Sequence, residues 1–246
     1  MKYIIAIDDT DNLQSRGTGH LARTLAAGLE EKELAFIENV TRHQLYVHKD
    51  IPFTSHNSSA SIVVEVLDNN IDNVIDYCRN HLLKESAEGS DAGLCVAAYD
   101  KISDDIVDWG KRAKYEILTK ENAHKLADKC GIYLEGLTGE KIGVIGSLAA
   151  VGLRFNGDDG RVLWIKNLRE LTGTFTIAEL NNVLKIDAIL TKEYLPIPDA
   201  SSIIIEAWPR PIVKNKKVTL IVEKTESDEE YHYRSAPKEF IKSITE

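Results

Sequence analysis

The first apolar run of the chain, Tyr3–Ile7, has no polar alternation, which predicts a strand buried on both faces. The polar segment Asp8–His20 follows it, and apolar residues then recur at helical spacing over Leu21–Leu29. The order is therefore strand, acidic turn, glycine-containing loop and helix. In α/β folds this order places polar groups at the carboxyl end of a strand, where ligands commonly bind.

The same pattern continues as alternating strands and helices up to about residue 138. β-branched and apolar runs predict strands, and apolar residues spaced three and four apart predict helices. The predicted strands cover residues 34–41, 60–67, 94–99 and 132–137, and the predicted helices cover 71–82, 103–119 and 123–130.

A second, smaller set of elements follows. The predicted helices cover 139–152, 177–184 after a Thr176 cap, and 235–246; the predicted strands cover 161–166, 202–207 and 217–222. The fold class is therefore mixed, an α/β domain over residues 1–138 followed by an α+β domain over residues 139–246. The glycines of 139–152 match neither the dinucleotide fingerprint nor the P-loop, so close helix packing is favoured there.

Three carboxylates, Asp8, Asp9 and Asp11, follow the first strand within four positions. Such hard oxygen ligands suit Mg²⁺, which is usually held by one or two carboxylates together with substrate phosphates. Gly17 and Gly19 allow close backbone approach, and the start of the next helix favours an anion. The alternative is that this segment only forms a turn and caps a helix. Three neighbouring carboxylates repel one another and need a cation or hydrogen-bond donors, so we favour the interpretation as a ligand site.

Residues 41–59 form a second polar segment that contains three histidines, His43, His48 and His56. Their spacing matches no known zinc motif. Two interpretations of this segment remain. Its polar side chains could donate hydrogen bonds to a phosphate or a polar substrate, or the segment could be a surface loop that is held by its own hydrogen bonds.

Composition narrows the class of protein. The chain has 246 residues, of which 43% are hydrophobic and 28% are charged, as in ordinary globular proteins. Neither a membrane-length apolar stretch nor a signal peptide is present in the sequence, so we expect a cytoplasmic protein without membrane contact. The three cysteines are widely spaced, which disfavours a structural zinc. The net charge of −9 disfavours autonomous, tight binding of nucleic acid.

Four stretches taken together resemble a known family, the archaeal ATP-dependent 2-agmatinylcytidine synthetases, which attach agmatine to the wobble cytidine of an isoleucine tRNA. The stretches are Ile7–Asp11, Ile51–Thr54 with Asn57, Ile145–Gly152 and Pro209–Val213. They occur in the family's order and span residues 4 to about 223.

The resemblance implies a kinase-like domain that binds ATP and Mg²⁺, followed by a ferredoxin-like domain. The family's enzymes cleave ATP, phosphorylate the cytidine carbonyl oxygen and displace that phosphate with an amine. Carried over by position, the metal and nucleotide ligands are Asp8, Asp9 and Asp11, and the contacts from the active-site loop are Thr54 and Asn57.

The sequence also departs from the family pattern. The family continues with an oligonucleotide-binding barrel and a zinc ribbon that grip tRNA, and this sequence reaches Glu246 before either. The family's threonine linked to phosphoryl transfer falls at His20 when aligned on Gly17, and at Thr18 when counted from Asp11. The family's Arg-Gly-Asn-Gly loop is Ser55–Ser58 here, which indicates a different substrate.

The leading hypothesis is an ATP- and Mg²⁺-dependent enzyme of the phosphoryl-transfer or ligase type. Gly17, Thr18 and Gly19 would cradle phosphates, and His20 or His56 would donate to the developing charge. The substrate would be tRNA presented with a partner protein, or a small molecule. One alternative is a non-catalytic, nucleotide-binding regulatory module of the same fold, and another is a nucleic-acid-binding protein that uses the ferredoxin-like domain.

Overall fold

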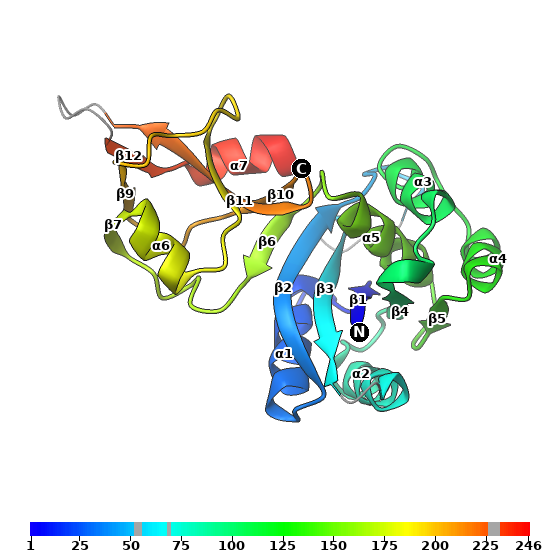
Figure 1. Cartoon of the computed structure of the whole chain (residues 1–246). Helices are drawn as coiled ribbons and strands as arrows, with labels where there is room; N and C mark the ends of the chain where they lie inside the picture. Colours follow the sequence, from blue (N-terminus) through cyan, green and yellow to red (C-terminus); the bar gives the residue numbers. More distant parts are fainter. Residues whose placement is uncertain (52–55, 68–69, 226–231) are drawn as a thin grey trace. The chain divides into compact units, whose positions relative to one another are not determined.

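Strands and helices alternate along the first two thirds of the chain, as the hydrophobic pattern predicts (Figure 1). The structure is a computed structural model that describes residues 1–51, 56–67, 70–225 and 232–246. It divides into two compact units, Met1–Asn156 and Gly157–Glu246. The mixed α/β class predicted from the sequence is confirmed.

The first unit contains five strands and five α-helices among its described residues. The strands are β1 (Lys2–Asp8), β2 (Ala35–Gln44), β3 (Ser58–Val66), β4 (Gly93–Ala98) and β5 (Tyr133–Gly136). The helices are α1 (Thr18–Glu31), α2 (Ile71–Glu85), α3 (Asp104–Arg112), α4 (Lys120–Cys130) and α5 (Val144–Asn156), and a short 3₁₀ turn covers Tyr99–Lys101.

The strands of this unit form one antiparallel sheet in the order β5-β4-β1-β3-β2. β1 is central: Ile7 lies opposite Ala60 of β3, and Asp8 lies opposite Gly93 of β4. Because the neighbours run antiparallel, the carboxyl end of β1 meets the amino ends of β3 and β4. The polar segment that follows β1 therefore lies beside the amino ends of β3 and β4, and not beside the carboxyl ends of parallel strands.

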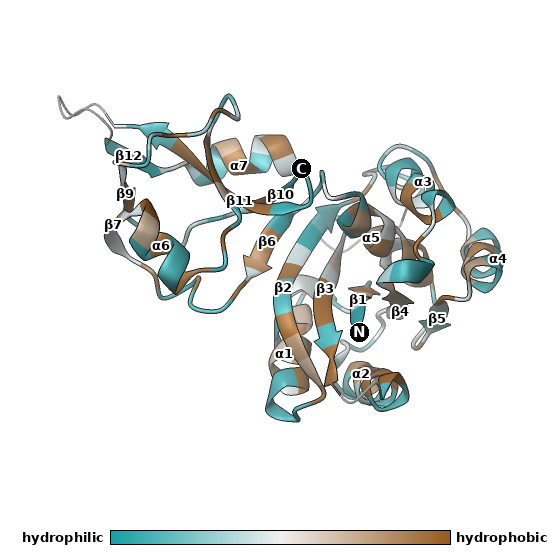
Figure 2. Ribbon diagram, in the orientation of Figure 1, coloured by the Kyte–Doolittle hydropathy of each residue, from teal (hydrophilic) through white to brown (hydrophobic). Residues whose placement is uncertain are grey.

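Helices cover both faces of this sheet, which explains why β1 is apolar on both sides. Figure 1 shows α1 and α2 on one face and α3, α4 and α5 on the other. Ile4 and Ala6 pack with residues of α3, α4 and α5 in one buried cluster, and the alternate residues Ile5 and Ile7 are also buried. Helices α2 and α4 show distinct hydrophobic and hydrophilic sides (Figure 2). None of the described helices is long and apolar enough to cross a membrane.

Helix α5 belongs to the first unit, whereas the sequence placed the domain boundary before it, between residues 138 and 139. It packs on β1, β3, β4 and α3. Its small residues permit this contact: a Cβ on Gly152 would overlap the carbonyl oxygen of Ile106 in α3, and one on Gly110 of α3 would lie 2.8 Å from the Ala149 oxygen. The prediction that these glycines serve helix packing is confirmed for Gly152.

The second unit contains seven strands and two helices among its described residues. The strands are β6 (Arg161–Trp164), β7 (Gly173–Thr176), β8 (Ala188–Thr191), β9 (Ser202–Ile205), β10 (Ile212–Lys214), β11 (Lys217–Lys224) and β12 (His232–Ser235). The helices are α6 (Ile177–Val183) and α7 (Lys238–Thr245). Their order in the sheet is β6-β10-β11-β12-β9-β7, and β8 joins β11 in parallel.

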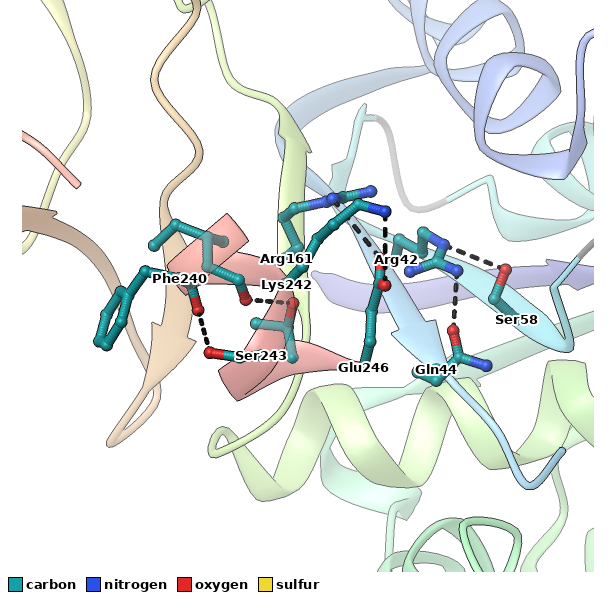
Figure 3. Close-up of polar contacts among 10 residues, drawn as sticks. Arg42, Gln44, Ser58, Arg161, Phe240, Lys242, Ser243 and Glu246 are labelled. Carbon is teal, nitrogen blue, oxygen red and sulfur yellow. Dashed lines mark hydrogen bonds and ion pairs between the residues drawn. The ribbon is translucent and has the colours of Figure 1, made fainter. Parts of the chain in front are cut away.

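The two faces of β11 bury two different clusters, as period-two alternation requires. Leu220 and Val222 lie in the larger core with α6, and Ile221 packs with Ile241 of α7 on the other face. Helix α6 begins with the predicted cap: Thr176 and Glu179 form a reciprocal capping box. At the end of α7, Glu246 pairs with Lys242 at 3.7 Å and with Arg161 at 3.8 Å (Figure 3).

Candidate functional site

The acidic segment begins where β1 ends. Asp8 follows the alternation of Ile4 and Ala6, so its side chain lies on the face that α5 covers, and Asp8 is only 8% exposed. Asp9 adopts a left-handed backbone conformation with φ 51°, which aspartate tolerates better than most residues. This turn ends the strand at Asp8 and directs the chain into the loop that precedes α1.

Glycines bring the start of α5 against Asp8. A Cβ on Gly143 would lie 2.7 Å from the Asp8 carbonyl oxygen and 2.5 Å from the amide nitrogen of Gly93. A Cβ on Gly146 would overlap Asp8 Oδ2 and lie 2.6 Å from Cγ of the same carboxyl group. Real Cβ atoms do not come this close to other atoms. The start of α5 can therefore pack against the Asp8 carboxyl group only because residues 143 and 146 are glycines.

Burial and neighbouring charge disfavour ionisation of these carboxyl groups. The pKa of Asp8 lies well above its usual value, chiefly because burial removes hydration and also because Asp9 is close. Burial, and then the charges of Asp91 and Asp11, raise the pKa of Asp9 from 3.8 to about 6. A bound cation would reverse this penalty, since it stabilises the ionised form of each carboxylate.

Asp8, Asp9 and Asp11 line one cavity, which we call the carboxylate cavity. Its volume is about 70 Å³. Glu116 adds a fourth carboxylate to the wall, and it is ion-paired with Arg112 at 2.9 Å. The apolar part of the lining comes from Leu45, Ile51, Ile117, Leu118, Ile142 and Ile145. The cavity thus joins an acidic end to an apolar wall.

The residues fit a partial ligand set for Mg²⁺. Within the described ranges, no three His, Cys, Asp or Glu side chains are arranged to hold a metal ion by themselves. Mg²⁺ usually keeps water and takes one or two protein carboxylates with phosphate oxygens. Asp8 and Asp9 could supply those carboxylates, and the burial of Asp8 in the same cavity as Asp9 favours a cation here, because burial opposes ionisation of an uncompensated carboxyl group.

The polar edge of the carboxylate cavity is formed by His56, Asn57 and Ser58. Asn57 is held firmly by three bonds: its carbonyl accepts from the amide of Leu45 at 2.8 Å and from Gln44 Nε2 at 2.8 Å, and its Nδ2 donates to the Tyr46 carbonyl at 2.6 Å. The sequence-predicted loop contact Asn57 therefore does reach the same cavity as the aspartates. Thr54, predicted with it, lies outside the described residues.

An arginine behind this edge connects it to β2. Arg42 donates from Nε to Ser58 Oγ at 3.1 Å and from its terminal nitrogen to Gln44 Oε1 at 2.8 Å (Figure 3). Because Gln44 in turn donates to the Asn57 carbonyl, the three side chains fix the start of β3 at the rim of the cavity.

Thr18 is placed inside the acidic loop, where its hydroxyl joins three groups. It donates to Asp11 Oδ1 at 2.9 Å and accepts from Thr10 Oγ1 at 3.0 Å and from the Thr10 amide at 3.3 Å. Thr18 is 6% exposed and does not line the carboxylate cavity. Its contacts indicate a role in positioning Asp11.

Gly17 and His20 lie around a different cavity, which we call the loop cavity; Gly19, next to them at the start of α1, is absent from its lining. Asp11 lines both cavities, so the loop cavity and the carboxylate cavity meet at this residue. The predicted set is therefore divided: Asp8, Asp9, Asp11, His56 and Asn57 surround one cavity, and Gly17 and His20 surround the other.

The other two histidines of the polar segment have structural contacts. His43 is fully buried, and its Nε2 is hydrogen-bonded to Ser61 Oγ at 2.8 Å. His48 lies 3.6 Å from an Asp50 oxygen. The alternative of a loop held by its own contacts therefore applies to His48, whereas His43 lies inside β2 and not in a loop, and His56 lines the carboxylate cavity.

Sequence reasoning missed several residues of the site. Gly146 was assigned to helix packing alone, and Glu116 was placed inside a continuous helix. Asp91 also belongs to the surroundings of the site: its charge acts on Asp9, and its carboxylate accepts from the amide of Glu140. Asp91 lies about 80 residues from the acidic segment, so proximity in the sequence does not connect them.

The fold resembles that of known tRNA-modifying enzymes. No protein-family model matches the chain, and no curated protein matches it. The crystal structure of a tRNA fluorescent labeling enzyme aligns with a TM-score of 0.54 at 24% identity, over 62% of this chain and 36% of that one. Apo TiaS, a tRNA agmatidine synthetase, aligns with a TM-score of 0.53 at 23% identity, over 62% and 35%.

The complex of TiaS with its tRNA and ATP aligns with a TM-score of 0.54 at 24% identity, over 62% of this chain and 36% of that one. The aligned region thus spans about a third of the length of these structures. At this identity the similarity establishes the fold, which the chain shares with part of TiaS.

Proposed function

We propose that the protein is an ATP- and Mg²⁺-dependent enzyme of the phosphoryl-transfer or ligase type that modifies tRNA or a small molecule. The observation that carries the proposal is the buried carboxyl group of Asp8, which shares one cavity with Asp9 and Asp11 and whose pKa burial raises. The fold shared with a protein crystallised with tRNA and ATP is consistent with it.

Each residue has a distinct part in this proposal. Asp8 and Asp9 would hold Mg²⁺, and Asp11, oriented by the Thr18 hydroxyl, would hold a metal-bound water or a third ligand position. Bound Mg²⁺ would neutralise charge on the transferred phosphate. Asn57 is fixed by Gln44 and Tyr46, so the adjacent polar edge is preorganised to orient a substrate group.

The acceptor is restricted by the walls of the carboxylate cavity. One end presents carboxylates, and the remaining wall is mainly aliphatic. At about 70 Å³ the cavity would admit only the reacting end of an acceptor, and a neutral end suits this lining better than a second anion does, because like charge would be brought against Asp8 and Asp9. His56, which lines the rim, would donate a hydrogen bond to the acceptor.

Calorimetric titration with ATP, with and without Mg²⁺, tests the proposal. The expected result is binding that requires Mg²⁺ and that Asp8→Asn abolishes, with Glu38→Gln as a control for a carboxylate outside the cavity; Glu38 pairs with Lys2 on the surface. Slow formation of ADP or AMP would distinguish an enzyme from a binding module of the same fold. ATP affinity that Asp8→Asn leaves unchanged would refute the metal assignment.

A further inference from the structure

A strip of five buried polar side chains lies on the face of the sheet that α5 covers. Each is at most 3% exposed, and the five are Asn39, Thr41 and His43 of β2 with Ser59 and Ser61 of β3. The β3 members alternate in phase with Val63, which packs in the same buried cluster as α5, and the β2 members lie opposite them or opposite Val63. Buried polar groups are costly unless they are hydrogen-bonded, so each member of the strip needs a partner.

Four members of the strip are hydrogen-bonded to one another or to α5. Asn39 Oδ1 accepts from Arg154 Nε of α5 and from Thr41 Oγ1, each at 3.2 Å. His43 Nε2 is hydrogen-bonded to Ser61 Oγ at 2.8 Å. These contacts satisfy the strip from its Arg154 end as far as Ser61.

Ser59, at the other end of the strip, differs from the rest. It is 1% exposed, and within the described ranges its Oγ has no hydrogen-bond partner. Ile7 lies opposite Ala60, so one further step along both strands places Ser59 beside Asp8 on the α5 face. Opposite residues of antiparallel strands have Cβ atoms about 4.5–5.5 Å apart, and rotation about the Ser59 Cα–Cβ bond can therefore bring its hydroxyl to the Asp8 carboxyl group.

The other positions that flank Asp8 have no side-chain donor. On the β4 side, Asp8 lies opposite Gly93. On the α5 side it meets Gly146, where an added Cβ would overlap Asp8 Oδ2. Of these three flanking positions, residue 59 is therefore the one whose side chain can donate a hydrogen bond to the carboxyl group.

We propose that Ser59 is a positioning residue for Asp8, in which the Ser59 hydroxyl donates to the Asp8 carboxylate and holds it oriented for a divalent cation. The proposal rests on the metal site of the proposed function and adds a residue to it. Carboxylates that ligate a metal are normally hydrogen-bonded in turn, which fixes their orientation and favours the ionised form. The same bond satisfies a buried hydroxyl and supports a buried carboxylate.

Titration with Mn²⁺ in the presence of ATP, followed by electron paramagnetic resonance against an ATP blank without protein, tests this role. Ser59→Ala should weaken Mn²⁺ binding by about 10–100-fold, the usual cost of removing the hydrogen-bond partner of a metal ligand. Ser61→Ala is the matched control, because Ser61 is equally buried on the same face of β3 but is bonded to His43. It should keep the wild-type affinity for Mn²⁺.

Urea unfolding of the metal-free protein separates positioning from an ordinary structural role. Ser59→Ala should unfold at the wild-type midpoint or above it, because the change removes a buried hydroxyl that has no partner among the described residues. Ser61→Ala should unfold at a lower urea concentration, because His43 loses its partner. A positioning role therefore predicts weaker metal binding without a loss of stability.

The outcomes distinguish this inference from the proposed function. If Asp8→Asn removes the protein-bound Mn²⁺ signal while Ser59→Ala binds like the wild type, the metal site stands and the role of Ser59 is overturned. Equal losses of affinity or of stability in Ser59→Ala and Ser61→Ala would overturn that role as well. Absence of protein-bound Mn²⁺ in the wild type would refute the metal site itself, and the role of Ser59 with it.

Discussion

Replacing Asp9 with Asn should make the metal-free protein more stable at neutral pH. Asn keeps the size of the side chain and tolerates the left-handed backbone at this position, where φ is 51°. The change removes a carboxylate whose ionisation is opposed by burial and by the charges of Asp91 and Asp11. The gain therefore comes from electrostatics and not from altered packing.

The magnitude follows from the pKa of Asp9. A rise from 3.8 to about 6 corresponds to about 3 kcal/mol at about 1.4 kcal/mol per pKa unit. Asp9 is partly exposed, so solvent screening reduces this to about 1–2 kcal/mol. Because the folded-state pKa of this acid is raised, the contribution of Asp9 to the stability of the wild type is most favourable below pH 4. That contribution is lost as the pH rises through about 6, and the loss is complete above pH 7.

Urea unfolding without Mg²⁺ at pH 4, 6 and 7.5 measures the effect. The free energy of unfolding of Asp9→Asn should match that of the wild type at pH 4 and exceed it by about 1–2 kcal/mol at pH 7.5. Asp72→Asn, on α2 and outside both cavities, is the control and should give no such pH-dependent gain. Equal stability at pH 7.5, or a difference that does not vary with pH, would refute the electrostatic reasoning.

The remaining predictions concern contacts around the site. Gly146→Ala should weaken Mg²⁺-dependent ATP binding and destabilise the fold by about 1–3 kcal/mol in urea unfolding, because its Cβ would overlap the Asp8 carboxyl; full stability and affinity would contradict this packing. Thr18→Val should cost about 1–3 kcal/mol, because the Thr10 and Asp11 groups lose a buried partner, whereas Thr24→Val at an exposed hydroxyl should cost far less. Mg²⁺ with ATP should raise the melting temperature of the wild type in a thermal scan and leave that of Asp8→Asn unchanged.

The regular elements could be predicted from the sequence because their signals are local. The apolar run before Asp8 became the central strand, the Thr176 cap proved correct, and the predicted helix over 123–130 ends where predicted, with Gly131 as its C-cap. The helix predicted over 103–119 was too long, since α3 ends at Arg112. The carbonyl of Ala113 accepts from the Tyr46 amide at 2.9 Å, a long-range bond that periodicity does not reveal.

The candidate site could be predicted only where its residues lie close together in the sequence. The three aspartates form one local cluster and do share a cavity. The placement of Gly17 and His20 around a second cavity depends on how the loop turns before α1 and on the position of α2. The approach of Gly146 depends on how α5 packs against Asp8, and the sequence gives no direct signal for that contact.

Electron paramagnetic resonance with Mn²⁺ in place of Mg²⁺ tests the central claim most directly, because it counts bound metal ions. Measured against an ATP blank without protein, the wild type should hold one further Mn²⁺ in a protein-bound signal, and Asp8→Asn should give only the signal of the Mn²⁺–ATP blank. Equal Mn²⁺ binding by the two proteins would show that the carboxylates after β1 do not hold the metal, and it would contradict the proposed site.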